Sequence, residues 1–115
     1  MKMVPNHGQH ANAEDALADV VARLVAGLDP IAIYLFGSRA RGDARADSDF
    51  DLLVVMDDEL GDLADDYDRA RAPLRGSGVG CDVVPVARWV FMENRNDVTT
   101  LSYQAFHHGR KLYNR

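Results

Sequence analysis

The spacing of hydrophobic residues near the start of the chain predicts a helix. Its apolar positions lie three and four residues apart, as they do along one face of a helix: Leu17, Val20, Val21, Leu24 and Leu28. Asn12 stands where a capping side chain would begin this helix, and Gly27 and Pro30 stand where it would end. We therefore expect a helix over residues 13–26.

Apolar runs further along the chain predict strands. Residues 31–36 are wholly apolar and rich in β-branched and aromatic types, which is typical of a strand buried on both faces. Residues 50–56 predict a second strand, and residues 81–86 a third. Because Pro85 cannot donate a hydrogen bond to a neighbouring strand, the third strand is expected at or near a sheet edge. Residues 111–113 are compatible with a short final strand.

Two further segments are expected to be helical. The first carries apolar residues at helical spacing: Leu60, Leu63, Tyr67, Ala70 and Leu74. Pro73 and the glycines that follow it would close this helix. The second segment covers residues 97–108, with Gly109 as its stop. Between the third strand and this last helix lie residues without a clear period, which fit either a core or an exposed partner surface: Trp89, Phe91 and Met92.

Length and composition fit a single domain. A chain of 115 residues with 47% hydrophobic residues is enough for one core and leaves little for a second. Residues 1–12 are polar and lack periodic apolar positions. We therefore expect a flexible N-terminal segment over residues 1–12 and one domain over residues 13–115.

Charge and cysteine content exclude several functional classes. The formal net charge of −5 disfavours general binding to a nucleic-acid backbone, which depends on clustered Lys and Arg, so no direct nucleic-acid binding is expected. No segment has the length of a transmembrane helix or the apolar run of a secretory signal, so no membrane association is expected. Cys81 has no second cysteine to pair with, which favours the reducing cytoplasm.

Candidate chemistry lies where the predicted strands begin and end. Gly37 follows the first strand and permits a sharp turn, while Ser38 offers a hydroxyl and an N–H to phosphate oxygens. Asp49 and Asp51 alternate at the start of the second strand and therefore project to one face. Asp82 opens the third strand, where it fits as a third carboxylate and could accept the proton of an attacking hydroxyl.

Carboxylates gathered in one place favour a cation among them, because like charges repel. Oxygen ligands without His or Cys favour Mg²⁺ or Mn²⁺ over zinc. Two such ions about 4 Å apart are an established arrangement for in-line phosphoryl displacement. We therefore interpret Asp49 and Asp51 as metal ligands, whereas Asp43 and Asp47 are more typical of a solvated loop.

These residues resemble the nucleotidyltransferase signature of the polymerase-beta superfamily, most closely that of the minimal nucleotidyltransferases. The matching stretches are Gly37-Ser38-Arg39-Ala40-Arg41-Gly42 and Asp49-Phe50-Asp51-Leu52, with ten residues between Ser38 and Asp49. The strands on either side and the ending of the chain also resemble this family, so the likeness covers nearly the whole chain. The resemblance implies an α+β fold of the polymerase-beta type, a mixed β-sheet flanked by helices.

The resemblance also implies roles for individual residues. Three carboxylates would form the catalytic and metal-binding triad: Asp49, Asp51 and Asp82. Two residues of the turn would hold the nucleotide triphosphate: Gly37 and Ser38. Arg39 and Arg41 are candidates for bidentate phosphate contacts, whereas Arg45 is more typical of a surface charge. No catalytic role is expected for His107 or His108, near a helix end.

Minimal members of this family are typically encoded beside a small helical HEPN-domain toxin. The resemblance implies that they act as antitoxins by transferring AMP from ATP to a tyrosine hydroxyl of that toxin. We therefore expect a Mg²⁺-dependent protein adenylyltransferase with two metal ions, ATP as donor and a HEPN-domain toxin as partner. Two alternatives remain open: nucleotide transfer to a small-molecule acceptor, and a non-catalytic antitoxin that neutralises a toxin by binding it.

Overall fold

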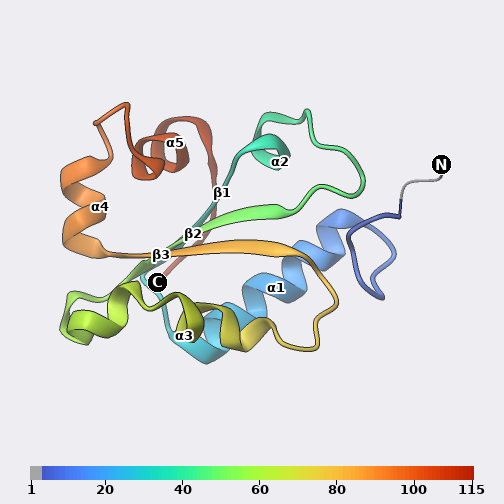
Figure 1. The fold of residues 1–115 in the computed structure, drawn as a ribbon, viewed down its shortest axis with the longest axis horizontal. Helices are drawn as coiled ribbons and strands as arrows, with labels where there is room; N and C mark the ends of the chain where they lie inside the picture. Colours follow the sequence, from blue (N-terminus) through green and yellow to red (C-terminus); the bar gives the residue numbers. More distant parts are fainter. Residues whose placement is uncertain (1–3) are drawn as a thin grey trace.

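Four strands form one mixed sheet in the computed structural model, which describes residues 4–115 (Figure 1). In chain order they are β1 (Ala32–Phe36), β2 (Phe50–Met56), β3 (Cys81–Ala87) and β4 (Arg110–Asn114). Across the sheet the order is β3-β2-β1-β4. β1 is antiparallel to β2 and β4, whereas β2 and β3 are parallel, which confirms the predicted mixed sheet. β3 lies at an edge, as its proline predicted.

Helices cover both faces of this sheet and complete an α+β fold. The α-helices are α1 (Ala13–Leu28), α2 (Ser38–Arg41), α3 (Tyr67–Arg71), α4 (Arg88–Asn94) and α5 (Leu101–His108). Two 3₁₀ helices, η1 (Asp58–Asp65) and η2 (Ala72–Leu74), flank α3. In Figure 1, α1 and α3 lie on one side of the sheet, and α4 and α5 lie on the other. Among residues 4–115, no helix combines the length and apolar character needed to cross a membrane.

The alternation of side chains along the strands divides the core into two layers. One set packs with the buried face of α1: Ile33, Leu35, Phe50, Leu52, Val54, Met56 and Val83. The other packs with α4 and α5: Ala32, Tyr34, Phe36, Leu53 and Val55. Asp51 alternates with Leu53 and therefore belongs to the second face. The candidate carboxylates thus lie on the side of the sheet that α4 and α5 cover.

The start of α1 is as predicted, but its end is not. The side chain of Asn12 caps the helix by accepting a hydrogen bond from the backbone N–H of Asp15 at 2.9 Å. The helix continues past Gly27 and ends where Asp29 adopts a left-handed conformation, with φ 46°. Gly27 serves close packing instead, because a Cβ on this residue would lie 2.6 Å from Cγ of Pro73.

The prediction of a single helix between Leu60 and Leu74 is wrong. η1, α3 and η2 replace it, because Gly61 has φ 56° and ψ −126°, which no regular helix contains. Asp66 then starts α3 by capping its first turn. As a result, Leu63 and Tyr67 do not join a continuous buried face, and about half of each side chain stays exposed.

α4 follows β3 directly and accounts for the residues without a period. Phe91 is buried and stacks on Tyr34, with ring centroids 5.4 Å apart. Trp89 and Met92 remain 58% and 44% exposed. Phe91 therefore belongs to the core, whereas Trp89 and Met92 are exposed, because one face of a short helix packs on the sheet while the other meets solvent.

The last helix is shorter than predicted. α5 begins after Thr100, whose hydroxyl caps it by accepting from the backbone N–H of Tyr103 at 3.1 Å. The residues from Asp97 to Thr100 form a turn rather than helix. Gly109 ends α5 as predicted, and the short final strand is confirmed as β4, paired with β1.

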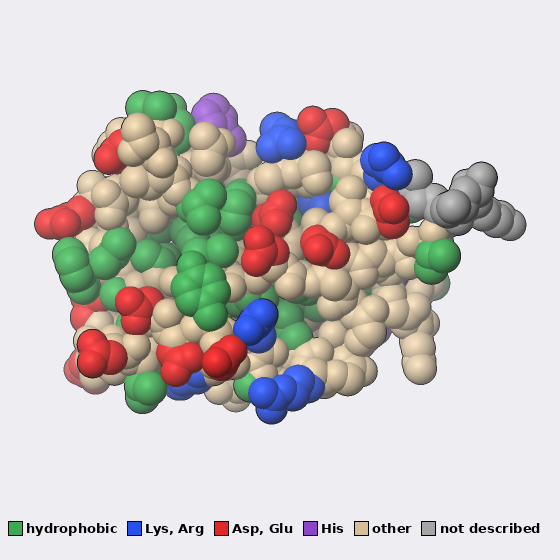
Figure 2. All heavy atoms as spheres, in the orientation of Figure 1, with side chains coloured by type: hydrophobic (Ala, Val, Ile, Leu, Met, Phe, Trp, Pro, Cys, Tyr) green, Lys and Arg blue, Asp and Glu red, His purple; other side chains and the backbone are tan. Residues whose placement is uncertain are grey.

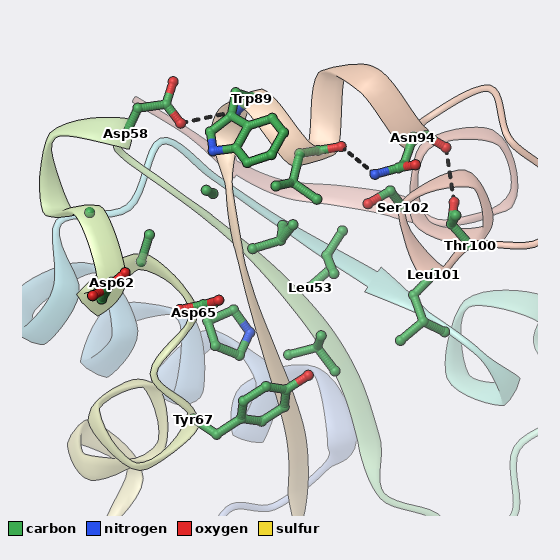
Figure 3. A pocket seen from close by; sticks show the side chains of 17 residues that line it. Leu53, Asp58, Asp62, Asp65, Tyr67, Trp89, Asn94, Thr100, Leu101 and Ser102 are labelled. Atoms are coloured by element: carbon green, nitrogen blue, oxygen red, sulfur yellow. Dashed lines mark hydrogen bonds between the residues drawn. The ribbon is translucent and has the colours of Figure 1, made fainter.

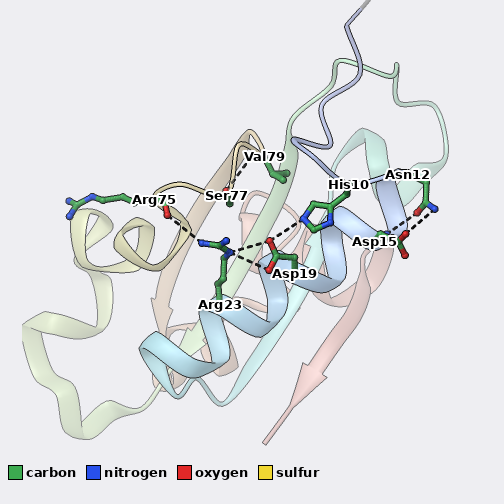
Figure 4. A network of polar contacts seen from close by, with 8 residues as sticks. All are labelled: His10, Asn12, Asp15, Asp19, Arg23, Arg75, Ser77 and Val79. Carbon is green, nitrogen blue, oxygen red and sulfur yellow. Dashed lines mark hydrogen bonds and ion pairs between the residues drawn. The ribbon is translucent and has the colours of Figure 1, made fainter.

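The N-terminal segment folds back onto α1 through a polar network (Figure 4). Nε2 of His10 lies 3.1 Å from Oδ2 of Asp19, and Nε of Arg23 donates to both oxygens of the same carboxylate. The hydrogen bond from His10, together with Arg23, lowers the pKa of Asp19 below its ordinary value. Residues 1–3 lie outside the described residues, and the flexibility expected of residues 1–12 stays a prediction.

Candidate active site

Asp51 and Asp82 lie side by side at the start of β2 and β3. They are partners in the register of these parallel strands, and on its other side Asp51 is paired with Phe36, the last residue of β1. Neighbouring strands are about 4.8 Å apart, so the two carboxylates project from one small area of the same face. Figure 2 shows acidic side chains grouped on the molecular surface beside a band of hydrophobic ones.

Asp49 precedes β2 and is exposed, but Asn6 restrains the loop that carries it. Nδ2 of Asn6 donates to Oδ1 of Asp49 at 3.4 Å and to the carbonyl oxygens of Ser48 and Gly80 at 3.1 and 2.9 Å. Its Oδ1 accepts from the backbone N–H of Gly80 at 2.6 Å. Asn6 therefore joins the two loops that lead into β2 and β3. No periodicity or motif in the sequence pointed to this residue.

Replacing Asn6 with alanine should destabilise the protein. The change removes hydrogen bonds to two loops and leaves the N–H of Gly80 without this acceptor, so we expect the free energy of unfolding to fall by about 1–3 kcal/mol. Urea denaturation measures the change. Gln9→Ala, an exposed position in the same segment, should change stability by less than about 0.5 kcal/mol. Equal stabilities of the two variants would contradict the bracing role.

Gly37 lies against the carboxylate of Asp51 at the turn between β1 and α2. Its backbone has φ 72° and ψ −155°, a region that is essentially restricted to glycine. A Cβ at this position would also overlap Oδ2 of Asp51. Ser38 is the first residue of α2, and Gly37 occupies the capping position, so Ser38 does not cap this helix.

The electrostatics of the site favour a cation. Burial raises the pKa of Asp51 above its ordinary value, and the charges of Asp82 and Asp49 raise it further, while Arg41 opposes the shift. Burial, followed by the charges of Asp49 and Asp51, also raises the pKa of the Cys81 thiol to about 12. Cys81 is therefore protonated at neutral pH and is not available as a nucleophile.

The donor set at this site fits Mg²⁺. Among residues 4–115, no three His, Cys, Asp or Glu side chains lie close enough together to hold a metal ion, so the predicted triad of Asp49, Asp51 and Asp82 is not a preformed three-ligand site. Mg²⁺ is usually held by one or two carboxylates together with substrate phosphates and water, so a complete protein cage is not required. Asp49, Asp51 and Asp82 would supply hard oxygen ligands, and a divalent cation would relieve the repulsion that, after burial, raises the pKa of Asp51.

Arg39 is engaged away from the carboxylates. Its guanidinium donates to the carbonyl oxygen of Ser48 at 2.8 and 3.3 Å and to that of Ala46 at 3.2 Å. It also lies 4.3 Å from the ring centroid of Phe50, which faces the α1 side of the sheet. Arg39 thus braces the loop before β2 from the face opposite Asp51, and this position does not support the phosphate contact expected of it.

Arg41 instead borders the site. Its charge acts on Asp51, and it lines a cavity of about 440 Å³ together with Gly37, Gln104 and His108. This volume is within the range of small-molecule sites. Gln104 and His108 are one helical turn apart on α5. The sequence analysis did not place Gln104 here and assigned no catalytic role to His108, because only the packing of α5 beside β1 brings these residues to the glycine turn.

Comparisons with known proteins agree with this fold. The model of the family described as "Nucleotidyltransferase domain" matches residues 15–106, more than half of the chain. A candidate nucleotidyltransferase from Sulfolobus solfataricus, known from its crystal structure, is 24% identical, with a TM-score of 0.56 over 86% of this chain and 78% of that one. No protein of curated function matches the sequence significantly.

A second solved structure is that of a toxin–antitoxin with AMP-PNP. It is also 24% identical, with a TM-score of 0.58 over 85% of this chain and 73% of that chain. At this identity the two solved structures support the fold alone. The match to the family model, which includes the glycine turn and all three carboxylates, covers the predicted site.

Proposed function

The chain belongs to the nucleotidyltransferase domain family, and on that premise we propose that it is a minimal nucleotidyltransferase of the antitoxin type. It transfers AMP from ATP to a tyrosine hydroxyl of a HEPN-domain toxin. The observation that carries this proposal is the register pairing of Asp51 with Asp82 directly beside Gly37. That arrangement joins a carboxylate site for divalent cations to a turn that admits phosphate.

The chain's own residues divide the tasks of binding. Gly37 and Ser38 hold the triphosphate at the turn before α2, and Arg41 supports its charge from the side of the 440 Å³ cavity. Asp49, Asp51 and Asp82 would hold two Mg²⁺ ions, which when bound supply positive charge to the phosphate oxygens in the transition state. Positioning and charge stabilisation account for most of the catalysis expected of such a site.

The reaction is an in-line displacement at the α-phosphorus of ATP. The acceptor oxygen forms a new bond to phosphorus as the bond to the bridging oxygen of the β-phosphate breaks, and pyrophosphate leaves. The hydroxyl proton passes to the carboxylate of Asp82, which is exposed at the start of the edge strand. Asp82 is suited to this task because it is more accessible than the half-buried Asp51.

The acceptor is proposed to reside on another protein. The similarity to a toxin–antitoxin structure with AMP-PNP supports a toxin partner and an adenine nucleotide. This support rests on the fold that the two structures share.

A labelling experiment tests this function. The purified chain is incubated with Mg²⁺, ATP labelled at the α-phosphate, and a small HEPN-domain toxin, and mass spectrometry locates the label. We expect AMP on a partner tyrosine and no label when Mg²⁺ is chelated. Label on a small molecule instead would favour the alternative acceptor. Protection from toxicity without any label, retained in an Asp49→Ala, Asp51→Ala variant, would favour neutralisation by binding.

A further inference from the structure

A second, larger cavity of about 630 Å³ lies on the same face of the sheet as the carboxylates (Figure 3). Its floor consists of Leu53 from β2 with Val84 and Val86 from β3. Trp89 of α4 and Leu101 of α5 line its sides, and in Figure 3 their side chains border the strands that form the floor. We call this cavity the β3 groove.

The β3 groove lies next to the candidate active site along β2 and β3. Leu53 is two residues beyond Asp51 and Val84 is two residues beyond Asp82, so each pair projects from one face of its strand. Two residues of strand span about 7 Å. A side chain of tyrosine's length that is anchored on the groove floor can therefore reach the carboxylates.

The groove lies on the side of the carboxylates that an attacking group would use. The cavity beside Gly37 and Arg41 adjoins β1, an interior strand, whereas the β3 groove adjoins β2 and the edge strand β3. In-line displacement requires the attacking and leaving oxygens on opposite sides of phosphorus. With pyrophosphate held at the glycine turn, the acceptor arrives from β3.

The rim of the groove is acidic. Asp58, Asp62 and Asp65 from η1 line it, and no Lys, Arg or His is among the described residues that do so. In the described part of the chain, neither Asp62 nor Asp65 is within ion-pair distance of a cation. Such a rim disfavours the triphosphate of a nucleotide and attracts cationic side chains.

We propose that the β3 groove binds the acceptor segment of a protein partner, with an apolar or aromatic side chain on its floor and Lys or Arg along its rim. The inference rests on the proposed transfer to a protein hydroxyl and adds the chemistry of the partner. Exposed Trp89 supplies the large aromatic contact surface that is common where one protein anchors another. The acidic rim sets the charge preference.

Two synthetic peptides provide the probe. Each carries a central tyrosine between leucines, flanked in one peptide by lysines and in the other by glutamates. Binding to the full chain is measured by fluorescence anisotropy without nucleotide, so the readout is independent of catalysis. We expect the lysine peptide to bind about tenfold more tightly at low salt, with a preference that shrinks as salt is raised.

Variants locate the binding. The double variant Asp62→Asn, Asp65→Asn should reduce the preference for the lysine peptide to about threefold or less, because it removes two negative charges from the rim. The fold should be preserved, because neither carboxylate accepts a hydrogen bond within residues 4–115. Asp58 is left intact because it accepts from the backbone N–H of Trp89 at 3.0 Å. Asp68→Asn, an exposed change in α3 outside the groove, should leave the preference unaltered.

A matched pair of variants on α4 tests the wall of the groove. Trp89→Ala should weaken both peptides by roughly tenfold, whereas Met92→Ala should not, because Met92 is exposed on the same helix but lines a different cavity. If Trp89→Ala instead abolished a dimer seen by analytical ultracentrifugation, a second copy would be the occupant and the proposal would fail.

Failure of this inference is distinguishable from failure of the proposed function. Peptides that do not bind even at roughly millimolar concentration, or that bind without charge preference, overturn the acceptor groove. Mg²⁺-dependent ATP binding, measured separately by calorimetry, would then still stand. Absence of ATP binding overturns the nucleotidyl transfer itself, whatever the peptides do.

Discussion

Asp51→Asn is expected to abolish nucleotidyl transfer while making the protein more stable at neutral pH. The change removes a ligand of the divalent cation, whose contribution of several kcal/mol to transition-state stabilisation corresponds to a loss of about 10³-fold or more. It also removes a half-buried charge that faces Asp82 and Asp49. Without divalent cations, we expect the melting temperature at pH 7 to rise by roughly 2–5 °C.

The pH dependence of stability follows from the direction of the Asp51 shift. The folded-state pKa lies above the ordinary value of 3.8, so the folded protein binds this proton more readily than the unfolded chain does. The resulting stabilisation is complete below pH 3.8 and is lost as the pH rises through the folded-state pKa. At pH 7 the ionised carboxylate therefore destabilises the fold, and Asp51→Asn should not show this loss.

Thermal denaturation with and without Mg²⁺ provides the measurement. Mg²⁺ should raise the melting temperature of the natural protein and have little effect on Asp51→Asn. Asp47→Asn, an exposed change in the same loop, is the control and should keep both activity and the response to Mg²⁺. An Asp51→Asn variant that retains transfer, or that melts below the natural protein at pH 7, would contradict this account of the site.

Gly37→Ala should impair both the fold and nucleotide binding. The new methyl group must occupy the space of the Asp51 carboxylate, and the backbone at φ 72° and ψ −155° costs a residue with a side chain on the order of 1–3 kcal/mol. We expect a corresponding fall in the free energy of unfolding. ATP affinity measured by calorimetry should fall as well, because relief of the overlap displaces Asp51 or the turn.

Gly42→Ala distinguishes the effect of backbone strain from the effect of overlap with the Asp51 carboxylate. Gly42 also has a positive φ of 84°, but no atom lies within 4 Å of the position of its missing Cβ. This variant should show a loss of stability from backbone strain alone and should bind ATP with unchanged affinity. If Gly42→Ala weakened ATP binding as much as Gly37→Ala, contact with Asp51 would not be the reason for glycine in the turn.

Much of the sheet could be predicted because its signals are local. The bounds of β2 match the predicted apolar run, and Pro85 placed β3 at an edge because a missing N–H has the same consequence in any fold. The capping role of Asn12 was equally local. The position of Asp82 predicted that it would share a face with Asp51, and the register of β2 and β3 agrees with this. Asp49 precedes β2, so the register does not test its predicted alternation with Asp51.

Other features depend on contacts between distant segments and left no local signal. Gly61 sits within a sequence of good helical spacing, yet its positive φ divides that segment. Asn6 acquires its role only when two loops, over forty and over seventy residues away, lie beside it. His108 was assigned no catalytic role, and it borders the glycine turn only through the docking of α5 on the sheet.

The two carboxylates of the motif differ in how freely they can move. Asp51 is embedded in a strand between two hydrogen-bonded neighbours, whereas Asp49 stands outside that strand, is exposed, and has its Oδ1 beside Gly80 and at 3.4 Å from Nδ2 of Asn6. Rearrangement upon arrival of substrate should therefore be concentrated in Asp49. Asp51 would then keep a fixed position, and the side chain of Asp49 would adjust to the group bound between the two carboxylates.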